Sequence, residues 1–216
     1  MTEHVFEPMR RAMVASQLRT TGVNDPRVVA AMGELPRERF VPEERSALAY
    51  ADALVPLGRG RALNPPMALG RMLSEARLRG NERALVIGAA TGYSAALLAR
   101  LAGSVVALEE DAALLAFAKT ALKGEPVEVA RGRLAGGWLK GAPYDFILID
   151  GAVEHVPLAI VEQAADNGQI SLGLVDNGVT RLAIGRVVSG AFGMNVYADA
   201  AAAILPGFER PRIFSF

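Results

Sequence analysis

The segment Ala84-Leu85-Val86-Ile87-Gly88-Ala89-Ala90-Thr91-Gly92-Tyr93 decides the fold of this chain. Its first four residues form a short, continuous apolar run, which is typical of a parallel strand buried on both faces. Small residues follow, and residues 94–101 then have the composition of a helix. A buried strand that leads through a glycine-containing turn into a helix predicts the first unit of a doubly wound α/β sheet.

The same pattern recurs further along the chain. We expect strands at residues 105–108, 127–129 and 146–149, and a helix at residues 111–122. Alternation of strands and helices predicts a mostly parallel sheet with right-handed crossovers. Beyond Pro157 we expect a helix to about Ala165, followed by C-terminal strands that form antiparallel edges. These strands are expected near residues 170–172, 180–184 and 194–203, although the alanine-rich residues 198–203 also fit a helix.

The residues before the glycine turn predict a helical segment. Phe6, Met9, Met13 and Leu18 recur at three- to five-residue spacing, which predicts an amphipathic helix that ends near Gly22. Asp25-Pro26 predicts the start of a second helix, because Asp caps helices and Pro fits the first position. Residues 37–66 are rich in proline and glycine and are expected to be irregular. The length of 216 residues suits one domain, with residues 1–65 as a helical, loop-rich segment and residues 66–216 as the sheet.

Composition excludes several classes of partner. Lys and Arg number 23, as do Asp and Glu, so the net charge indicates neither a nucleic acid nor a membrane surface as partner. The chain has no cysteine, which excludes disulfides, thiolate metal sites and a cysteine nucleophile. The N-terminal sequence lacks a secretory apolar core, so we expect a cytoplasmic protein. His155 with Asp150 and Glu154 does not make a metal-ligand set, and no metal is expected.

The turn after the first strand is a candidate ligand site, because doubly wound sheets bind ligands where such strands end. Its small residues would let backbone amides approach a ligand; they are Gly88, Ala89, Ala90 and Gly92. The spacing differs from the dinucleotide fingerprint and from the P-loop, which favours a less anionic nucleoside. A tight turn that needs glycine only for its conformation is the alternative.

Glu109 ends the next strand, about 20 residues after the turn, where a carboxylate can accept both ribose hydroxyls. The alternative is an acidic helix start stabilised by the helix dipole. The enzymatic interpretation requires the Glu109 side chain to lie beside the turn. It also requires the crevice there to be free of the protein's own side chains.

Colinear segments over nearly the whole chain resemble the protein-L-isoaspartate O-methyltransferase family. The segments are Gln17-Leu18, Gly22-Val23-Asn24-Asp25, Leu35-Pro36-Arg37-Glu38-Arg39-Phe40-Val41-Pro42, Ala49-Tyr50-Ala51-Asp52, Pro56-Leu57-Gly58-Arg59-Gly60, Gly137-Trp138 and Ala142-Pro143-Tyr144-Asp145. The resemblance implies a Rossmann-like methyltransferase fold, S-adenosylmethionine as methyl donor, and isoaspartyl carboxylates of damaged proteins as acceptors. It places residues 1–65 on the acceptor side and residues 66–216 around the cofactor, with Tyr93 and Leu134 as wall contacts. The oligomeric state does not follow.

The family's chemistry suits the residues present. A carboxylate is already ionised at pH 7, so its attack on a sulfonium methyl needs alignment and charge placement but no general base. The chain departs from the family in the acceptor loop, where Ala62-Leu63-Asn64-Pro65-Pro66 replaces Thr-Ile-Ser-Gln-Pro. Asn64 is therefore a catalytic candidate that could donate a hydrogen bond to the acceptor, or it is a turn residue.

Three further departures concern the cofactor side and the fourth strand. The first loop reads Gly-Ala-Ala-Thr-Gly instead of Gly-Thr-Gly-Ser-Gly, and Val86 replaces an acidic residue. Gly132-Arg133-Leu134 replaces Gly-Asp-Gly, which removes an acceptor for the adenine amino group and predicts weaker cofactor binding. Asp150-Gly151-Ala152 replaces Thr-Ala-Ala, and an ionised Asp150 would repel an isoaspartyl carboxylate.

Three hypotheses follow from these residues. The first is an isoaspartyl methyltransferase of the family, divergent and of weak activity. The second is a methyltransferase that uses Asp150 as base on a hydroxyl or amine, while a structural Asp150 is the alternative to any catalytic role. The third is a homologue that keeps the fold for cofactor sensing or protein interaction, because Asn64, Arg133 and Asp150 all depart from the pattern.

Overall fold

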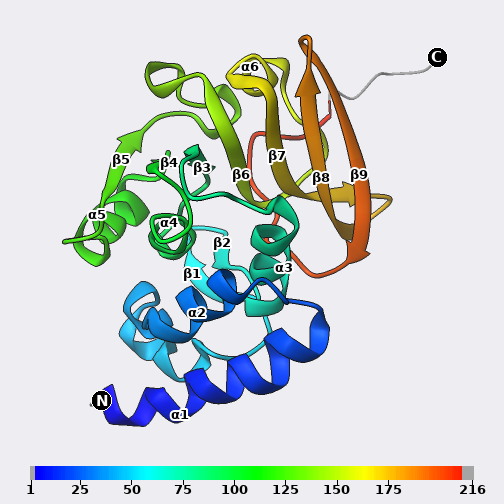
Figure 1. The fold of residues 1–216 in the computed structure, drawn as a ribbon. Coiled ribbons are helices and arrows are strands. Elements are labelled where there is room, and N and C mark those ends of the chain that lie inside the picture. The colour runs from blue at the N-terminus through cyan, green and yellow to red at the C-terminus, as the bar shows by residue number, and fades with distance from the viewer. Residues whose placement is uncertain (1–2, 211–216) are drawn as a thin grey trace.

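A seven-stranded sheet forms the body of the molecule in the computed structural model, which describes residues 3–210 (Figure 1). The strand order is β5-β4-β3-β6-β7-β8-β9. Neighbouring strands run parallel from β5 through β7, and β8 and β9 are antiparallel. The strands are β3 (Arg83–Ile87), β4 (Ser104–Glu109), β5 (Val127–Arg131), β6 (Tyr144–Val153), β7 (Ala164–Asp176), β8 (Val179–Val188) and β9 (Ala191–Asp199). The predicted fold class, a mostly parallel α/β sheet with antiparallel edge strands, is confirmed.

The position of the central strand β3 explains why residues 84–87 are all apolar. It lies between β4 and β6, and Ala84 through Ile87 are fully buried because both faces of the sheet are covered. The helices are α3 (Pro66–Ala76), α4 (Tyr93–Leu98), α5 (Ala112–Ala121) and α6 (Leu158–Val161). The first βα unit and the helix after β4 therefore lie where the sequence predicts them, and Asp111 caps α5 by accepting from Ala113 N and Leu114 N.

The N-terminal segment packs against the carboxyl ends of the central strands (Figure 1). Its first helix, α1 (Glu3–Met13), continues through a π-helical turn (Val14–Leu18) and a 3-10 turn (Arg19–Thr21) to Gly22, which has a φ of 89°. The second helix, α2 (Pro26–Glu34), begins with the predicted Asp25 cap, which accepts a hydrogen bond from Arg27 N. Both predicted helices of this segment are confirmed.

The residues predicted to be irregular contain more structure than expected. Residues 37–66 hold two 3-10 turns (Arg37–Phe40 and Glu43–Leu48) and a small antiparallel hairpin of β1 (Val55–Gly58) and β2 (Arg61–Leu63). The hairpin matters for the site, because β2 and the residue that follows it direct Arg61 and Asn64 toward the sheet. The helix α3, which follows directly, was not among the sequence expectations.

The helix predicted from Pro157 to about Ala165 is wrong in length. It is the single turn α6, and β7 has begun by Ala164. Gln163 explains the early end: its side chain bonds to Gly136 O, Ala159 O and Trp138 N, and its carbonyl accepts from Tyr144 N. These bonds tie the chain to the loop before β6 and turn it into the sheet.

Residues 200–208, here called the C-terminal segment, return across the end of β6. Ala152 forms a parallel bridge with Ile204, donating from its N–H to Ala203 O at 2.7 Å and accepting from Leu205 N at 2.9 Å. Residues 198–203, which fitted a strand or a helix, form neither throughout: β9 ends at Asp199, and residues 200–203 are not helical. Leu205 and Phe208 are buried, so the segment is packed against the sheet.

Candidate active site

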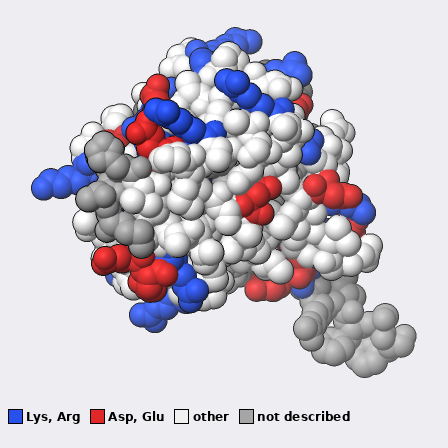
Figure 2. Space-filling model, turned by 90° about the horizontal axis from the view of Figure 1, so that it is seen from below, with Lys and Arg blue, Asp and Glu red and all other residues white. Residues whose placement is uncertain are grey.

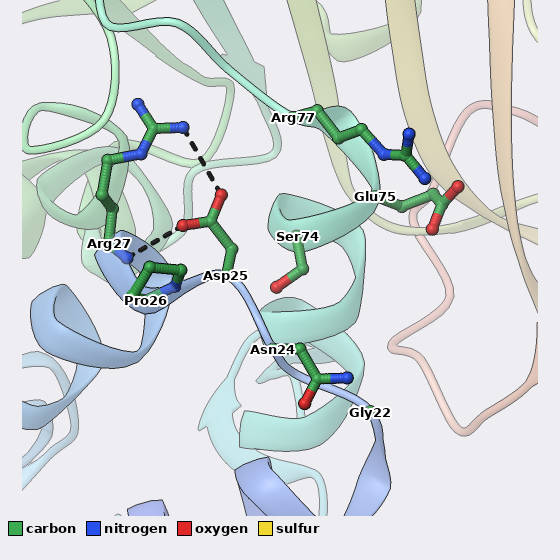
Figure 3. A pocket seen from close by; sticks show the side chains of 8 residues that line it. All are labelled: Gly22, Asn24, Asp25, Pro26, Arg27, Ser74, Glu75 and Arg77. Carbon is green, nitrogen blue, oxygen red and sulfur yellow. Dashed lines mark hydrogen bonds and ion pairs between the residues drawn. The ribbon is translucent and has the colours of Figure 1, made fainter.

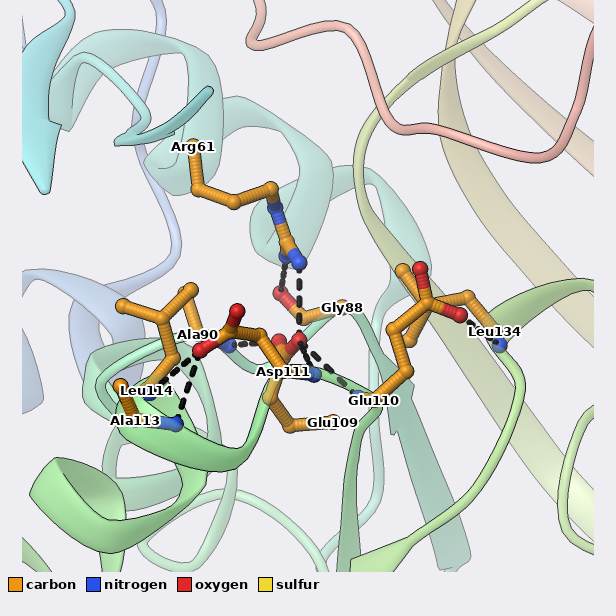
Figure 4. A network of polar contacts seen from close by, with 9 residues as sticks. All are labelled: Arg61, Gly88, Ala90, Glu109, Glu110, Asp111, Ala113, Leu114 and Leu134. Atoms are coloured by element: carbon orange, nitrogen blue, oxygen red, sulfur yellow. Dashed lines mark hydrogen bonds and ion pairs between the residues drawn. The ribbon is translucent and has the colours of Figure 1, made fainter. Parts of the chain in front are cut away.

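The Glu109 carboxylate lies directly beside the glycine turn. Its Oε2 accepts from Ala90 N at 2.8 Å, and its Oε1 accepts from Glu110 N and Asp111 N at 3.0 Å each (Figure 4). The parallel register of β3 and β4 causes this meeting, because it brings both strand ends to the same edge of the sheet. The first geometric requirement of the cofactor hypothesis is thereby satisfied.

Arg61 occupies the space in front of that carboxylate. From β2 its Nη1 contacts Glu109 Oε1 at 2.9 Å and its Nη2 donates to Gly88 O at 2.9 Å (Figure 4). The guanidinium therefore spans from the end of β4 to the turn after β3. Arg61 is 5% exposed and Glu109 is fully buried, so this ion pair is shielded from water.

Leu205 of the C-terminal segment fills the adjoining space. A Cβ built on Gly88 would lie 3.0 Å from Leu205 Cδ1 and 3.1 Å from Arg61 Nη2, so both side chains touch the open side of that glycine. Gly88, Ala89, Ala90 and Gly92 are all buried. The second requirement, a crevice free of the protein's own side chains, is not met in this conformation.

The two acceptor-side candidates meet at the end of β6. Asn64 Nδ2 donates to Asp150 Oδ1 at 2.8 Å, and Asn64 Oδ1 accepts from Ala203 N at 2.7 Å. Both side chains are buried. Residues separated by 86 positions in the chain thus form one hydrogen-bonded pair, held from the other side by the C-terminal segment. A role for Asn64 as a local turn residue does not account for these bonds to distant parts of the chain.

Burial determines the electrostatics of this pair. It raises the pKa of the Asp150 carboxyl above the ordinary value, and the hydrogen bond from Asn64 and the charges of Arg61 and Arg37 only partly oppose it. Arg37 is itself fully buried, and burial lowers the pKa of its guanidinium. Its Nη2 donates to Asn64 O, so Arg37 fixes the backbone of the loop that carries Asn64.

The remaining predicted residues lie around the same strand ends. Tyr93 begins α4 fully buried, and its ring contacts Phe40 and the Arg37 guanidinium, whose Cζ is 4.6 Å from the ring centroid. Leu134 is buried, and its N–H donates to Glu110 Oε2 at 3.2 Å. The side chain of Arg133 is exposed. The roles of Tyr93 and Leu134 as cofactor walls stay predictions.

One surface hollow of about 540 Å³ lies outside this site (Figure 3). It is formed by residues at the start of α2 and the end of α3, including Asp25, Arg27 and Glu75. Asp25 is already engaged there as the cap of α2 and by the Arg27 side chain. Within residues 3–210, no group of three or more His, Asp or Glu side chains is arranged to hold a metal ion.

Comparison with known proteins decides the family. The model of the family described as protein-L-isoaspartate(D-aspartate) O-methyltransferase matches residues 9–184. The chain belongs to this family. A protein-L-isoaspartate O-methyltransferase of Rhodopseudomonas palustris (strain HaA2) is 41% identical over 168 residues, covering 76% of this chain and 69% of the relative. One from Marinobacter nauticus (strain ATCC 700491 / DSM 11845 / VT8) is 36% identical over 208 residues, covering 93% of this chain and 94% of the relative.

Solved structures agree with the fold. A structure named protein-L-isoaspartate O-methyltransferase aligns with a TM-score of 0.79 at 21% identity, covering 92% of this chain and 66% of that one. A Plasmodium falciparum structure described as a complex with S-adenosyl-L-homocysteine aligns with a TM-score of 0.75 at 17% identity, covering 91% of this chain and 97% of that one. At these identities the likeness shows the fold. Membership makes the chain a protein-repair methyltransferase of an S-adenosylmethionine-dependent family.

The residues of this isoaspartyl methyltransferase homologue fit the family's cofactor in their chemistry but not in their present arrangement. Glu109 is the carboxylate that can accept ribose hydroxyls, and it lies beside the glycine turn, whose Ala90 N–H already donates to it. Arg61 contacts this carboxylate, and Arg61 and Leu205 fill the open side of Gly88. A cofactor can use these anchors once the two side chains have moved.

Sequence reasoning missed Arg61, Arg37 and Leu205. The contacts of Arg61 join residues 48 and 27 positions apart, and no local pattern reports such a pairing. A sign was nevertheless present for Arg37, because the family-like segment from Leu35 to Pro42 contains it. The buried Leu205 follows a run of alanines that gave no distinct periodicity.

Proposed function

We propose that this chain transfers a methyl group from S-adenosylmethionine to the carboxylate of isoaspartyl residues in damaged proteins. The observation that carries the proposal is a convergence at the carboxyl ends of three parallel strands. The turn amides, Glu109 and the Asn64–Asp150 pair all meet there, in a chain whose family performs this reaction.

Glu109 would hold the ribose of the cofactor, and the small residues of the glycine turn would let the cofactor approach the backbone closely. When bound, it supplies an electrophilic methyl group on a sulfonium. The isoaspartyl carboxylate is the nucleophile and is ionised at neutral pH, so the protein's task is alignment and charge placement.

Asn64 is the residue best placed to align the acceptor. One N–H of its carboxamide binds Asp150 and its Oδ1 is fixed by Ala203 N, which leaves the second N–H to donate to an incoming carboxylate. Burial raises the pKa of Asp150, which shifts this carboxyl toward its neutral form and so lessens its repulsion of a second carboxyl group.

A second candidate reaction uses Asp150 as general base on an acceptor that must lose a proton. Two features of Asp150 support this reaction. Its carboxyl group is buried on β6 with a raised pKa, and it accepts a hydrogen bond from Asn64. Asp150→Asn separates the two. Turnover on the true acceptor would be abolished if Asp150 is the base, whereas isoaspartyl methylation should persist, because the carboxamide introduced by this substitution can still accept a hydrogen bond from Asn64.

Isoaspartyl segments of proteins are the partners that this function requires. Figure 2 shows acidic and basic side chains interspersed on the described part of the face formed by the N-terminal segment, which suits polypeptides of varied charge. We also place the protein in the cytoplasm, where repair substrates arise and where a chain without cysteine suits reducing conditions. Within residues 3–210, no helix is long and apolar enough to cross a membrane.

The test is incorporation of radiolabelled methyl groups into an isoaspartyl peptide, with the same peptide containing normal aspartate as substrate control. We expect base-labile incorporation into the isoaspartyl peptide only. Asn64→Ala should lower kcat/KM about tenfold to a hundredfold, as expected for the loss of one hydrogen bond to a charged carboxylate. Asn195→Ala, a change of an exposed residue on β9, is the matched control. Absence of incorporation at saturating donor would reject the proposal.

A further inference from the structure

The Glu109 carboxylate already has four donors from its own chain. Three are the backbone N–H groups of Ala90, Glu110 and Asp111, and the fourth is Arg61 Nη1. The backbone donors belong to the glycine turn and to the two residues that follow Glu109. Arg61 differs from them, because it reaches the carboxylate by a side chain from another part of the molecule (Figure 4).

Arg61 fills the space next to the carboxylate that the proposed function assigns to the ribose. Its guanidinium binds Glu109 and Gly88 O together, so a ribose hydroxyl that approached Glu109 from the side of Gly88 would meet this guanidinium. Leu205 closes the same space from the C-terminal segment, against Gly88. The two occupants approach from different elements, and both are almost fully buried.

The closed arrangement of Arg61 and Leu205 leaves one polar group unsatisfied, which makes displacement of these side chains feasible. Among the described residues, Arg61 Nε is buried without a hydrogen-bond partner. A buried donor left without a partner weakens the closed arrangement relative to one in which water reaches it. The C-terminal segment that carries Leu205 is held to β6 by the two backbone hydrogen bonds of Ala152 and to Asn64 by the Ala203 N–H.

We propose that Arg61 is a built-in competitor for the ribose position, which, with Leu205, keeps the cofactor crevice closed until both side chains are displaced. This inference rests on the proposed function only in assigning Glu109 to the ribose. Because the binding-competent state is then a fraction of the population, the apparent affinity for the cofactor falls by that fraction. Removing either occupant therefore tightens binding.

Calorimetric titration with S-adenosylhomocysteine tests the proposal. We expect Arg61→Met to bind at least about tenfold more tightly than the wild type, since about 1.4 kcal/mol of competition corresponds to a factor of ten. Arg59→Met makes the same change at an exposed position of the same hairpin and should bind like the wild type. Leu205→Ala should also tighten binding, whereas Ile204→Ala, at a neighbouring residue that is 64% exposed, should not.

Several outcomes would overturn the proposal. If Arg61→Met binds more weakly, Arg61 holds the ligand instead of excluding it, and if no variant differs from the wild type, Arg61 and Leu205 are not the obstacle. Should Arg61→Met fail to fold, Arg61→Gln answers the same question, because it keeps one donor for Glu109 and vacates part of the space. Folding of each variant is verified by its thermal midpoint.

The peptide methylation assay separates this inference from the proposed function. Tighter binding by Arg61→Met without methylation of any isoaspartyl peptide supports the competitor and rejects the function. If the wild type methylates the isoaspartyl peptide but binds S-adenosylhomocysteine more tightly than Arg61→Met, the proposed function is supported and the competitor role of Arg61 is rejected.

Discussion

Ala90 carries a backbone conformation that an alanine rarely adopts. Its φ is 48°, in the left-handed region, and its N–H must point at Glu109 for the turn to hold that carboxylate. A side chain there costs roughly 1–2 kcal/mol relative to glycine, which is partly offset because glycine gives the unfolded chain more freedom. The turn thus keeps this conformation at some expense in stability.

We predict that Ala90→Gly raises the free energy of unfolding by about 0.5–1 kcal/mol, measured by urea denaturation. The control is Ala89→Gly at the preceding residue, whose φ is not positive. There, glycine adds freedom to the unfolded chain and also removes a buried methyl group, so stability should fall by about 1–2 kcal/mol. A loss of stability in Ala90→Gly would contradict the strain assigned to this position.

Asp150 predicts a particular pH dependence of stability. Burial places its folded-state pKa above the unfolded value of about 3.9, so the folded state binds the proton more tightly. Stability contributed by the protonated form is therefore complete at low pH and is lost as the pH rises from the unfolded pKa through the folded one.

In Asp150→Asn this loss is absent, and the Asn64 hydrogen bond can persist. The variant should gain stability over the wild type as the pH rises from about 4, by about 1.4 kcal/mol for each pH unit that separates the two pKa values. Urea denaturation at a series of pH values measures the difference. Asp199→Asn, which changes a side chain that is 81% exposed, is the control and should show no comparable trend. If Asp150→Asn also shows no trend, the folded-state pKa of Asp150 is not raised.

At the scale of elements, the C-terminal segment depends on a glycine in β6. A Cβ built on Gly151 would lie 2.5 Å from Ala203 O and 2.6 Å from Leu205 Cγ, so the segment can pack there only because that position has no side chain. We predict that Gly151→Ala costs about 1–3 kcal/mol of stability, as overpacking does, and loosens residues 200–208.

Urea denaturation measures the cost, and hydrogen exchange of the Ala203 and Leu205 amides measures the loosening. Gly193→Ala is the matched control in β9, because its Cβ would meet nothing within 4 Å. Gly193→Ala should leave both quantities nearly unchanged. Full protection of the two amides in Gly151→Ala would show that the segment accommodates the extra carbon without moving.

Elements defined by local pattern were predictable, and contacts between distant elements were not. The apolar run of β3 and the Asp-Pro start of α2 carry their structure in adjacent residues, and both are confirmed. The helix α3 had a signal as well, since its buried positions 68, 69, 72, 73 and 76 follow a helical period, but the preceding prolines favoured a loop. In the site, Glu109 was predictable from its place at the end of a strand. Arg61 and the Ala203–Asn64 bond, which spans 139 positions, depend on how the chain folds back on itself.

At the scale of the whole molecule, the Arg61–Glu109 contact has a second consequence. It joins the N-terminal segment, through β2, to the ends of β3 and β4, so the group that fills the crevice also ties two parts of the molecule together. Breaking a buried ion pair by removing one partner typically costs about 3–5 kcal/mol, because the other charge stays buried. The three backbone donors that remain on Glu109 reduce this cost.

We therefore predict opposite effects of Arg61→Met on the free and the liganded protein. Without ligand, its free energy of unfolding should fall by about 2–4 kcal/mol relative to the wild type. With saturating S-adenosylhomocysteine, its thermal midpoint should rise by more than that of the wild type, because a ligand stabilises in proportion to the logarithm of its concentration over its dissociation constant. Scanning calorimetry with and without the ligand measures both, with Arg59→Met as reference. An unliganded variant as stable as the wild type would mean that the ion pair contributes nothing to holding the N-terminal segment on the sheet, and the link between a closed crevice and a stable fold would be lost.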